Sequence, residues 1–234
     1  MQMNRFILSL FSTVLLTSCA SEYNIEGTSS VSRLDGKMLF IKVPRAGKMV
    51  KVDSAEVVHG TFTMNGVADT AQIASLYMDD ESILPLVVEK GKIKITIDYV
   101  RSKVSGTPLN ESLYKYLEKK SAIDDKAYEL ERKESRMIMD GKQTEEVDFE
   151  INREKEKILS ELTSLSTNFI KDNYENILGP GMFIMLCANL ECPLMTPEIQ
   201  KFIDDSPDCF RLHPMIQEYI DIAKLNAEKL KVSH

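Results

Sequence analysis

The sequence predicts an α+β protein, in which an antiparallel β-sandwich or barrel-like N-terminal domain precedes a long helical hairpin and shorter C-terminal helices. Short apolar segments recur about every ten residues between Tyr23 and Thr107, separated by glycine and polar turns, as in sandwiches and barrels. After Pro108 the apolar residues recur at three- and four-residue intervals, which is the period of a helix. Residues 140–142, Asp-Gly-Lys, interrupt that pattern and predict a turn between two antiparallel helices.

The β-domain is expected over residues 19–108. In residues 61–67, Phe62 and Met64 face one side and polar residues face the other, which is the period of a half-buried strand. Residues 57–64 predict two strands around a tight turn at His59 and Gly60. Residues 89–92 predict a hairpin-like connection between the last two strands, at 84–89 and 92–99.

The helical region is expected over residues 109–234, with the hairpin at 109–174 and the shorter helices at 181–231. The first apolar stripe comprises Leu109, Leu113, Tyr116, Ile123, Ala127, Leu130 and Met137, and the second comprises Val147, Ile151, Ile158, Leu162, Leu165 and Phe169. Residues 179–181, Gly-Pro-Gly, are expected to separate the hairpin from a helix that begins at Met182. Thr196 followed by Pro197 predicts the start of another helix, and Pro214 the start of the last one.

Residues 1–18 predict a lipoprotein signal peptide. A polar start with Arg5 precedes an apolar run at residues 6–16, which is too short to cross a bilayer but suits a signal peptide. The run ends in Leu16-Thr17-Ser18-Cys19, which resembles the bacterial lipobox. That resemblance implies cleavage before Cys19, a diacylglyceryl thioether on its sulfur and an acylated new amino terminus, with palmitate among the acyl groups. Two or more acyl chains anchor a protein stably, so Cys19 is the expected lipidation site. Ordinary signal cleavage with an incidental cysteine is the alternative.

The charge balance bears on the partners of the chain. The net charge is −7, and cleavage before Cys19 would remove one cation, Arg5, to leave −8. An acidic protein is a poor match for nucleic acid and for anionic lipid, so no nucleic-acid partner is expected.

Three further cysteines follow Cys19. Cys187 lies in an apolar run and is expected to be a buried, inert thiol. Cys192 and Cys209 are the candidate pair for a disulfide in an oxidising compartment, with free thiols as the alternative. No Cys-x-x-Cys is present, so the sequence contains no dithiol redox motif.

Several segments resemble one family in both sequence and order: Gly27, residues 35–37, 52–54, 60–62, 86–91 and 104–110, the last reading Val-Ser-Gly-Thr-Pro-Leu-Asn. They resemble an uncharacterised β-domain, a domain of unknown function that precedes thioredoxin-like domains in Bacteroidetes lipoproteins. Residues 169–173 and 177–180 are similar to the helical part that follows it there. The thioredoxin domain itself is expected to be missing, because nothing matches its Trp-Cys-x-x-Cys segment and the sequence has no Trp. The oxidoreductase activity of those relatives is therefore not carried over.

No catalytic, cofactor or metal site is predicted. His59, His213 and His234 lack the close spacing of a zinc pair, and residues 79–81 lack the alternation of a calcium loop. No Gly-x-Ser-x-Gly elbow and no phosphate-binding glycine loop is present.

The sequence therefore predicts a lipid-anchored, non-catalytic binding module of the bacterial envelope, on the periplasmic face of the outer membrane. Its expected contacts are the membrane, through the anchor, and an envelope protein or a glycan. The alternative is an accessory protein to a separately encoded thioredoxin-like oxidoreductase, acting through Cys192 or Cys209.

Overall fold

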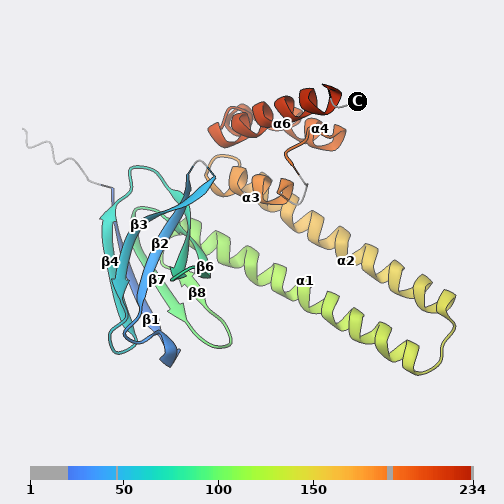
Figure 1. The fold of residues 1–234 in the computed structure, drawn as a ribbon, viewed down its shortest axis with the longest axis horizontal. Coiled ribbons are helices and arrows are strands. Elements are labelled where there is room, and N and C mark those ends of the chain that lie inside the picture. Colours follow the sequence, from blue (N-terminus) through green and yellow to red (C-terminus); the bar gives the residue numbers. More distant parts are fainter. Residues whose placement is uncertain (1–20, 46, 189–191, 233–234) are drawn as a thin grey trace, which may run out of the picture.

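The structure is a computed structural model that describes residues 21–45, 47–188 and 192–232. Two four-stranded sheets are followed by helices, so the predicted α+β class is confirmed (Figure 1). The predicted signal peptide at residues 1–18 and Cys19 lie outside the described residues. No described helix is long and apolar enough to cross a bilayer.

The two sheets pack face to face as a sandwich. The first has the order β4 (Thr61–Val67), β1 (Glu22–Ser29), β7 (Gly91–Ile97), β8 (Lys103–Ser105). The second has the order β3 (Lys48–Glu56), β2 (Met38–Arg45), β5 (Gln72–Met78), β6 (Glu81–Val88). A short 3₁₀ helix, η1 (Ser32–Leu34), links β1 to β2 and the other sheet.

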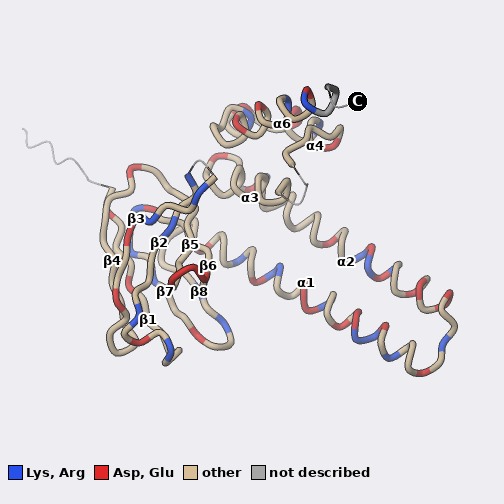
Figure 2. Tube along the Cα trace, viewed as in Figure 1, with Lys and Arg blue, Asp and Glu red and all other residues tan. Residues whose placement is uncertain are grey.

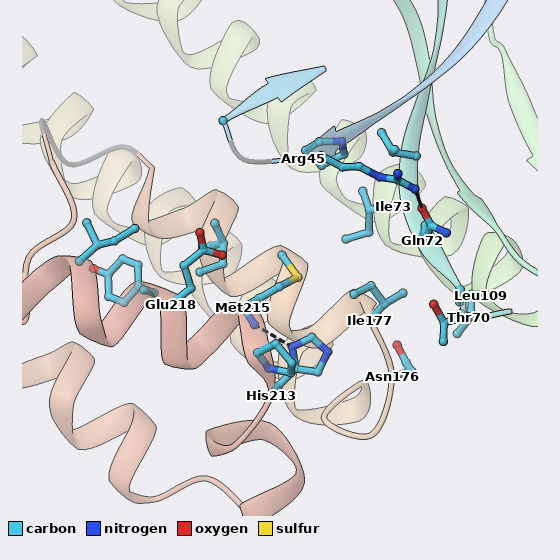
Figure 3. A pocket seen from close by; sticks show the side chains of 18 of the residues that line it. Arg45, Thr70, Gln72, Ile73, Leu109, Asn176, Ile177, His213, Met215 and Glu218 are labelled. Carbon is cyan, nitrogen blue, oxygen red and sulfur yellow. Dashed lines mark hydrogen bonds between the residues drawn. The ribbon is translucent and has the colours of Figure 1, made fainter. Parts of the chain in front are cut away.

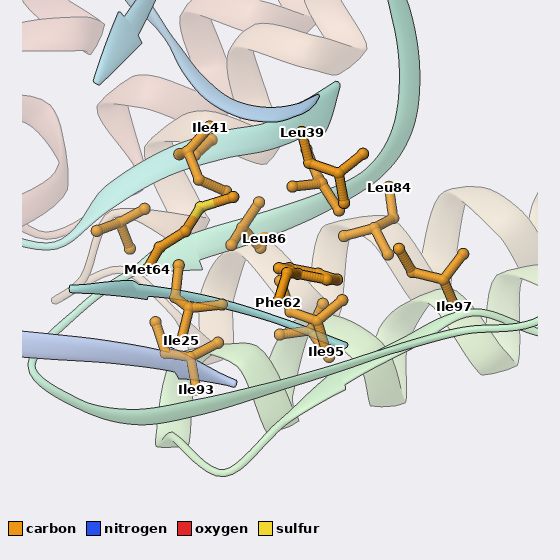
Figure 4. Close-up of a cluster of buried hydrophobic side chains, with 14 of the residues drawn as sticks. Ile25, Leu39, Ile41, Phe62, Met64, Leu84, Leu86, Ile93, Ile95 and Ile97 are labelled. Carbon is orange, nitrogen blue, oxygen red and sulfur yellow. The ribbon is translucent and has the colours of Figure 1, made fainter. Parts of the chain in front are cut away.

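The core between the sheets follows the predicted alternation. Phe62 and Met64 are buried while their neighbours in β4 are exposed. The inward side chains of both sheets meet in one cluster, which includes Ile25, Leu39, Ile41, Leu84, Leu86, Ile93, Ile95 and Ile97 (Figure 4). Burial of this apolar surface is the main force that holds the two sheets together.

The tight turn at His59 and Gly60 is confirmed. Both residues have positive φ, 50° and 72°, and Val58 pairs with Thr61 across them. Positive φ at both central residues defines the turn whose twist matches a β-hairpin.

Two details of the sandwich differ from the sequence-based prediction. β1 and β7 pair in parallel, with Ile25 opposite Ile93, whereas the other strand pairs are antiparallel. Residues 89–92 do not form a hairpin, because β6 and β7 belong to different sheets and this segment crosses between them. Period-two alternation shows which side chains point inward, but it does not show whether consecutive strands are hydrogen-bonded neighbours.

The helical hairpin consists of α1 (Pro108–Met139) and α2 (Thr144–Asp172), with the predicted break between them. Its outer part projects away from the sandwich (Figure 1). A small core of Leu130, Met137, Val147 and Ile151 joins the two helices there. Basic and acidic residues are interspersed along both helices (Figure 2), and most of them are exposed, so the hairpin has a solvated, mixed-charge surface.

Four shorter helices complete the chain: α3 (Leu178–Cys187), α4 (Pro197–Asp204), α5 (Asp208–Arg211) and α6 (Pro214–Val232). The predicted helix starts at Thr196 and Pro214 are confirmed, and the Thr196 hydroxyl accepts a hydrogen bond from the backbone N–H of Ile199 at 3.3 Å.

The prediction that residues 179–181 separate two helices is wrong, because these residues form the first turn of α3. Pro180 is tolerated there since the first backbone N–H groups of a helix have no intrahelical partner. Gly179 and Gly181 are required by packing: a Cβ would meet the carbonyl oxygen of Asn173 at the first position and the side chain of Ile73 at the second.

Candidate functional site

A buried polar joint connects the sandwich to the hairpin. The side chain of Asn110 has no exposed surface; its Oδ1 accepts from the Val87 N–H at 2.9 Å, and its Nδ2 donates to the Val87 carbonyl at 2.7 Å. Glu89 Oε1 accepts from the backbone N–H groups of Leu109 and Asn110, at 2.9 and 3.1 Å. A carboxylate on the first N–H groups of a helix is stabilising, so Glu89 caps α1. These hydrogen bonds orient α1 on the sandwich.

A cavity of about 990 Å³ lies between the second sheet and the C-terminal helices (Figure 3). We call it the sheet–helix cavity. One wall comes from the end of β2, from Gly47 in the turn after it, and from the start of β5 with the two residues before it. The other wall comes from the turn between α2 and α3, from α3 and from the start of α6. Its size lies within the range of small-molecule sites.

The surface of the cavity is mostly apolar. Its apolar side chains include Val43, Ile73, Leu109, Ile177, Ile184, Met215 and Ile222. Gly181 faces Ile73 so closely that a Cβ would collide with it, and this contact fixes the position of α3 against the second sheet.

The sheet wall carries one cation, Arg45, and a second cation, Lys48, lies beside it. The Arg45 guanidinium donates a 3.5 Å hydrogen bond to the Gln72 side-chain oxygen. Lys48 lies directly opposite Arg45 in the β2–β3 register. Among the described residues, neither cation has a carboxylate within 4.0 Å.

The helical wall carries a histidine and two carboxylates. His213 Nδ1 accepts a 3.3 Å hydrogen bond from the backbone N–H of Met215, and burial lowers the pKa of this imidazole. His213 is therefore neutral at pH 7, with its remaining proton on Nε2. Glu175 and Glu218 are exposed at the cavity and form no ion pair with the described residues. Arg45 and Glu218 enter from opposite sides (Figure 3).

The cysteines are divided between different environments. Cys187 is buried, as expected, and burial raises the pKa of its thiol. Cys209 is exposed, Cys192 is half-buried, and all three thiols are free in the structure. The Cys192–Cys209 disulfide stays a prediction.

The described residues also bear on metal binding. The described part of the chain contains no group of three or more His, Cys, Asp or Glu that could hold a metal ion. Asp79 and Asp80 lie in the turn between β5 and β6, where the Lys42 ammonium donates to the Asp79 carbonyl at 2.9 Å and lies 3.6 Å from Asp80. This acidic turn is therefore held by a lysine.

Sequence reasoning missed Arg45 and His213 as site residues. They belong to segments far apart in the chain, and each looks unremarkable alone. Only the packing of α6 beside the β2–β3 end brings them to one cavity.

Residues 23–113 match a family model described as a domain of unknown function (DUF4369). The β-domain, together with the first turns of α1, is therefore this uncharacterised domain, as the sequence resemblance indicated. No curated protein matches the chain.

The structure gives the shared segments a physical role. Phe62 covers Gly27, where a Cβ would collide with the ring. The Tyr23 hydroxyl donates to Asp53 at 2.7 Å and ties the two sheets together. Residues 86–91 and 104–110 form the polar joint of Glu89 and Asn110. These segments build the domain and lie mostly away from the sheet–helix cavity.

Proposed function

We propose that the protein is a lipid-anchored envelope protein that binds a ligand in the sheet–helix cavity and catalyses no reaction on it. The observation that carries this proposal is the cavity itself: concave, mostly apolar, with a few polar groups at its rim. The lipobox-like sequence at Cys19 supports the anchor and the envelope location.

The chemistry of the cavity favours binding over catalysis. Its described lining includes no serine or cysteine, and the Thr70 hydroxyl is its one aliphatic hydroxyl. A hydroxyl nucleophile needs an adjacent general base. His213 is a poor base here, because its Nδ1 already accepts a backbone N–H and burial lowers its pKa.

A cavity-filling substitution tests the proposal. Ile222 and Leu225 are both partly exposed on α6, but only Ile222 lines the cavity. The probe is anilinonaphthalene sulfonate, an apolar anion that becomes fluorescent in apolar sites. We expect Ile222→Trp to weaken dye binding at least about fivefold because the indole occupies the cavity, whereas Leu225→Trp should leave it unchanged. Equal dye affinity in both variants would contradict the proposal.

The accessory role beside a thioredoxin-like protein remains a second candidate, favoured by the exposed thiol of Cys209. An exposed thiol can attack or accept a disulfide, whereas a buried one such as Cys187 cannot. Acid quenching and thiol trapping in cells should then yield a mixed disulfide that disappears in Cys209→Ser and persists in Cys187→Ser. Absence of that adduct would remove this candidate.

A further inference from the structure

The two walls of the sheet–helix cavity carry opposite charges that do not neutralise each other. Arg45 lines the sheet wall, with Lys48 opposite it in the β2–β3 register, and Glu175 and Glu218 line the helical wall. No salt bridge joins the walls among the described residues. Figure 3 shows Arg45 and Glu218 on opposite sides of the space, with apolar side chains between them.

The sheet wall has capacity for an anion. Arg45 and Lys48 occupy directly opposite positions of adjacent strands, an arrangement in which like charges repel. Arg45 has five N–H donors, and its described side-chain partner is one neutral amide oxygen, from Gln72, at the long distance of 3.5 Å. A carboxylate at this wall would relieve the repulsion and accept a charge-assisted pair of hydrogen bonds.

The helical wall has capacity for a cation. Glu218 points from α6 into the cavity, and Glu175 lies at its rim, so their charges add there. The neighbouring His213 is neutral at pH 7 and therefore does not compensate them. An ammonium group is a strong donor that fits such a carboxylate.

Between the charged walls, the lining selects an apolar body. A glycan would lose many hydrogen bonds with water on entering the cavity. Side chains such as Ile73, Ile184 and Ile222 would offer it none in return. A fatty acid would match Arg45, but it would offer no cationic group to the carboxylate of Glu218.

We infer that the sheet–helix cavity binds a short apolar peptide by both free ends, with the terminal carboxylate at Arg45 and the terminal ammonium at Glu218. This inference rests on the proposed function and names the chemistry of its ligand. A cavity of about 990 Å³ has room for a few residues.

Calorimetry with three forms of trileucine tests the two contacts separately: free at both ends, amidated at the carboxyl end, and acetylated at the amino end. In the wild type, amidation and acetylation should each weaken binding about tenfold, because each removes one charge-assisted contact. In Arg45→Gln, amidation should change the affinity by less than about twofold, whereas acetylation should still weaken binding. In Glu218→Gln the pattern should be reversed.

Matched controls are Arg101→Gln and Glu118→Gln, a salt-bridged pair that lies away from the cavity. Both should retain the wild-type discrimination. The inference is overturned if the amide binds as well as the free acid, or if decanoate binds more tightly than every peptide form. If Ile222→Trp weakens dye binding but no form of trileucine binds, the peptide inference alone is overturned. If, in addition, Ile222→Trp and Leu225→Trp bind the dye with equal affinity, the proposed function is overturned as well.

Discussion

Asn110 is fully buried, although its side chain ends in a polar amide. It bonds the Val87 N–H and carbonyl, the two groups that a neighbouring strand would otherwise satisfy, and it also donates to the Thr107 hydroxyl at 2.9 Å. One amide therefore replaces a strand at this point and docks α1 onto β6. The Thr-Pro-Leu-Asn sequence at residues 107–110 marks this contact rather than a site of chemistry.

Removing that amide should be costly. Asn110→Ala leaves the buried N–H and carbonyl of Val87 without partners, and each unsatisfied group costs about 1–3 kcal/mol. We expect a loss of about 3 kcal/mol in the free energy of unfolding, measured by urea denaturation. The control Asn65→Ala removes an exposed side chain and should change it by less than about 0.5 kcal/mol. Similar losses in the two variants would refute the role assigned to Asn110.

Tyr219 makes stability depend on pH in the alkaline range. Burial, followed by its contact with Cys187, raises the pKa of this phenol to about 12. The unfolded chain releases the same proton near pH 10, so the folded state holds it more tightly. The stabilisation is complete below about pH 10 and is lost as the pH rises toward 12.

Tyr219→Phe should therefore lose stability less steeply than the wild type between pH 10 and pH 12, as measured by the urea midpoint at each pH. The variant also loses the 2.6 Å bond to the Leu194 carbonyl, but that cost is present at neutral pH as well. Tyr128→Phe, at an exposed position, should run parallel to the wild type. An unchanged slope in Tyr219→Phe would rule out this linkage.

At the scale of single elements, α3 contains glycines that packing favours over alanine, although alanine is normally the better helix former. An alanine in place of a helical glycine normally stabilises by about 1 kcal/mol. At Gly179 the new Cβ would meet the backbone carbonyl of Asn173, which cannot move without shifting α2, whereas at Gly181 it would meet the flexible end of Ile73. The sequence shows the glycines but not the close approach of distant segments, and this is why the helix start was misplaced.

We accordingly expect Gly179→Ala to destabilise the protein by about 2 kcal/mol, in the range of overpacked cores. Gly181→Ala should cost less, because the Ile73 side chain can rotate. Thermal unfolding of both variants provides the comparison, and a stabilised Gly179→Ala would show that α3 is free to shift.

The outer hairpin is held by a few apolar side chains rather than by its many charges. Lys133 bonds Glu154 at 2.8 Å and also pairs with Glu150, but these side chains are about one-third exposed. Such surface pairs contribute about 0–1 kcal/mol each. Ile151, in the small core with Leu130, Met137 and Val147, is buried.

Ile151→Ala should destabilise the outer hairpin by about 2–4 kcal/mol, and Lys133→Met by less than about 1 kcal/mol. Amide hydrogen exchange resolves the effect by segment, with faster exchange expected between residues 130 and 151 and unchanged exchange in the sandwich. Faster exchange in Lys133→Met than in Ile151→Ala would reverse this ranking.

On the scale of the whole molecule, the order of β-segments, helical hairpin and short helices followed from local periodicity, and the structure confirms it. The parallel β1–β7 pair and the crossing of residues 89–92 between sheets did not follow, because pairing depends on contacts between distant segments. The cavity could not be predicted either, since its walls come from residues 43–73, from Leu109 and from residues 175–222.

The predicted anchor at Cys19 would also act at this scale. β1 begins at Glu22, so a lipid on Cys19 would hold the sandwich within about 10 Å of the bilayer, at no more than about 3.6 Å per residue. α1 alone is about 48 Å long, at 1.5 Å for each of its 32 residues. The hairpin ends at the far side of the molecule from the sandwich (Figure 1).

If the proposed anchor is correct, Cys19→Ser should release the chain from the membrane, because it removes the sulfur to which the lipid would be attached. Partition into a detergent phase and labelling with palmitate are the measurements. Cys209→Ser should remain in the detergent phase. A Cys19→Ser chain that stays membrane-bound and labelled would place the anchor elsewhere.

The position of β1 in its sheet also affects how the protein folds. The first strand of the domain is an inner strand, with Ile25 opposite Met64 on one side and Ile93 on the other. The partner β4 ends at Val67 and the partner β7 at Ile97, so β1 has both neighbours only late in the synthesis of the domain, and contacts between such distant segments form slowly. The N-terminal segment therefore cannot fold early on its own. A nascent chain with this topology therefore stays open until its last strands arrive.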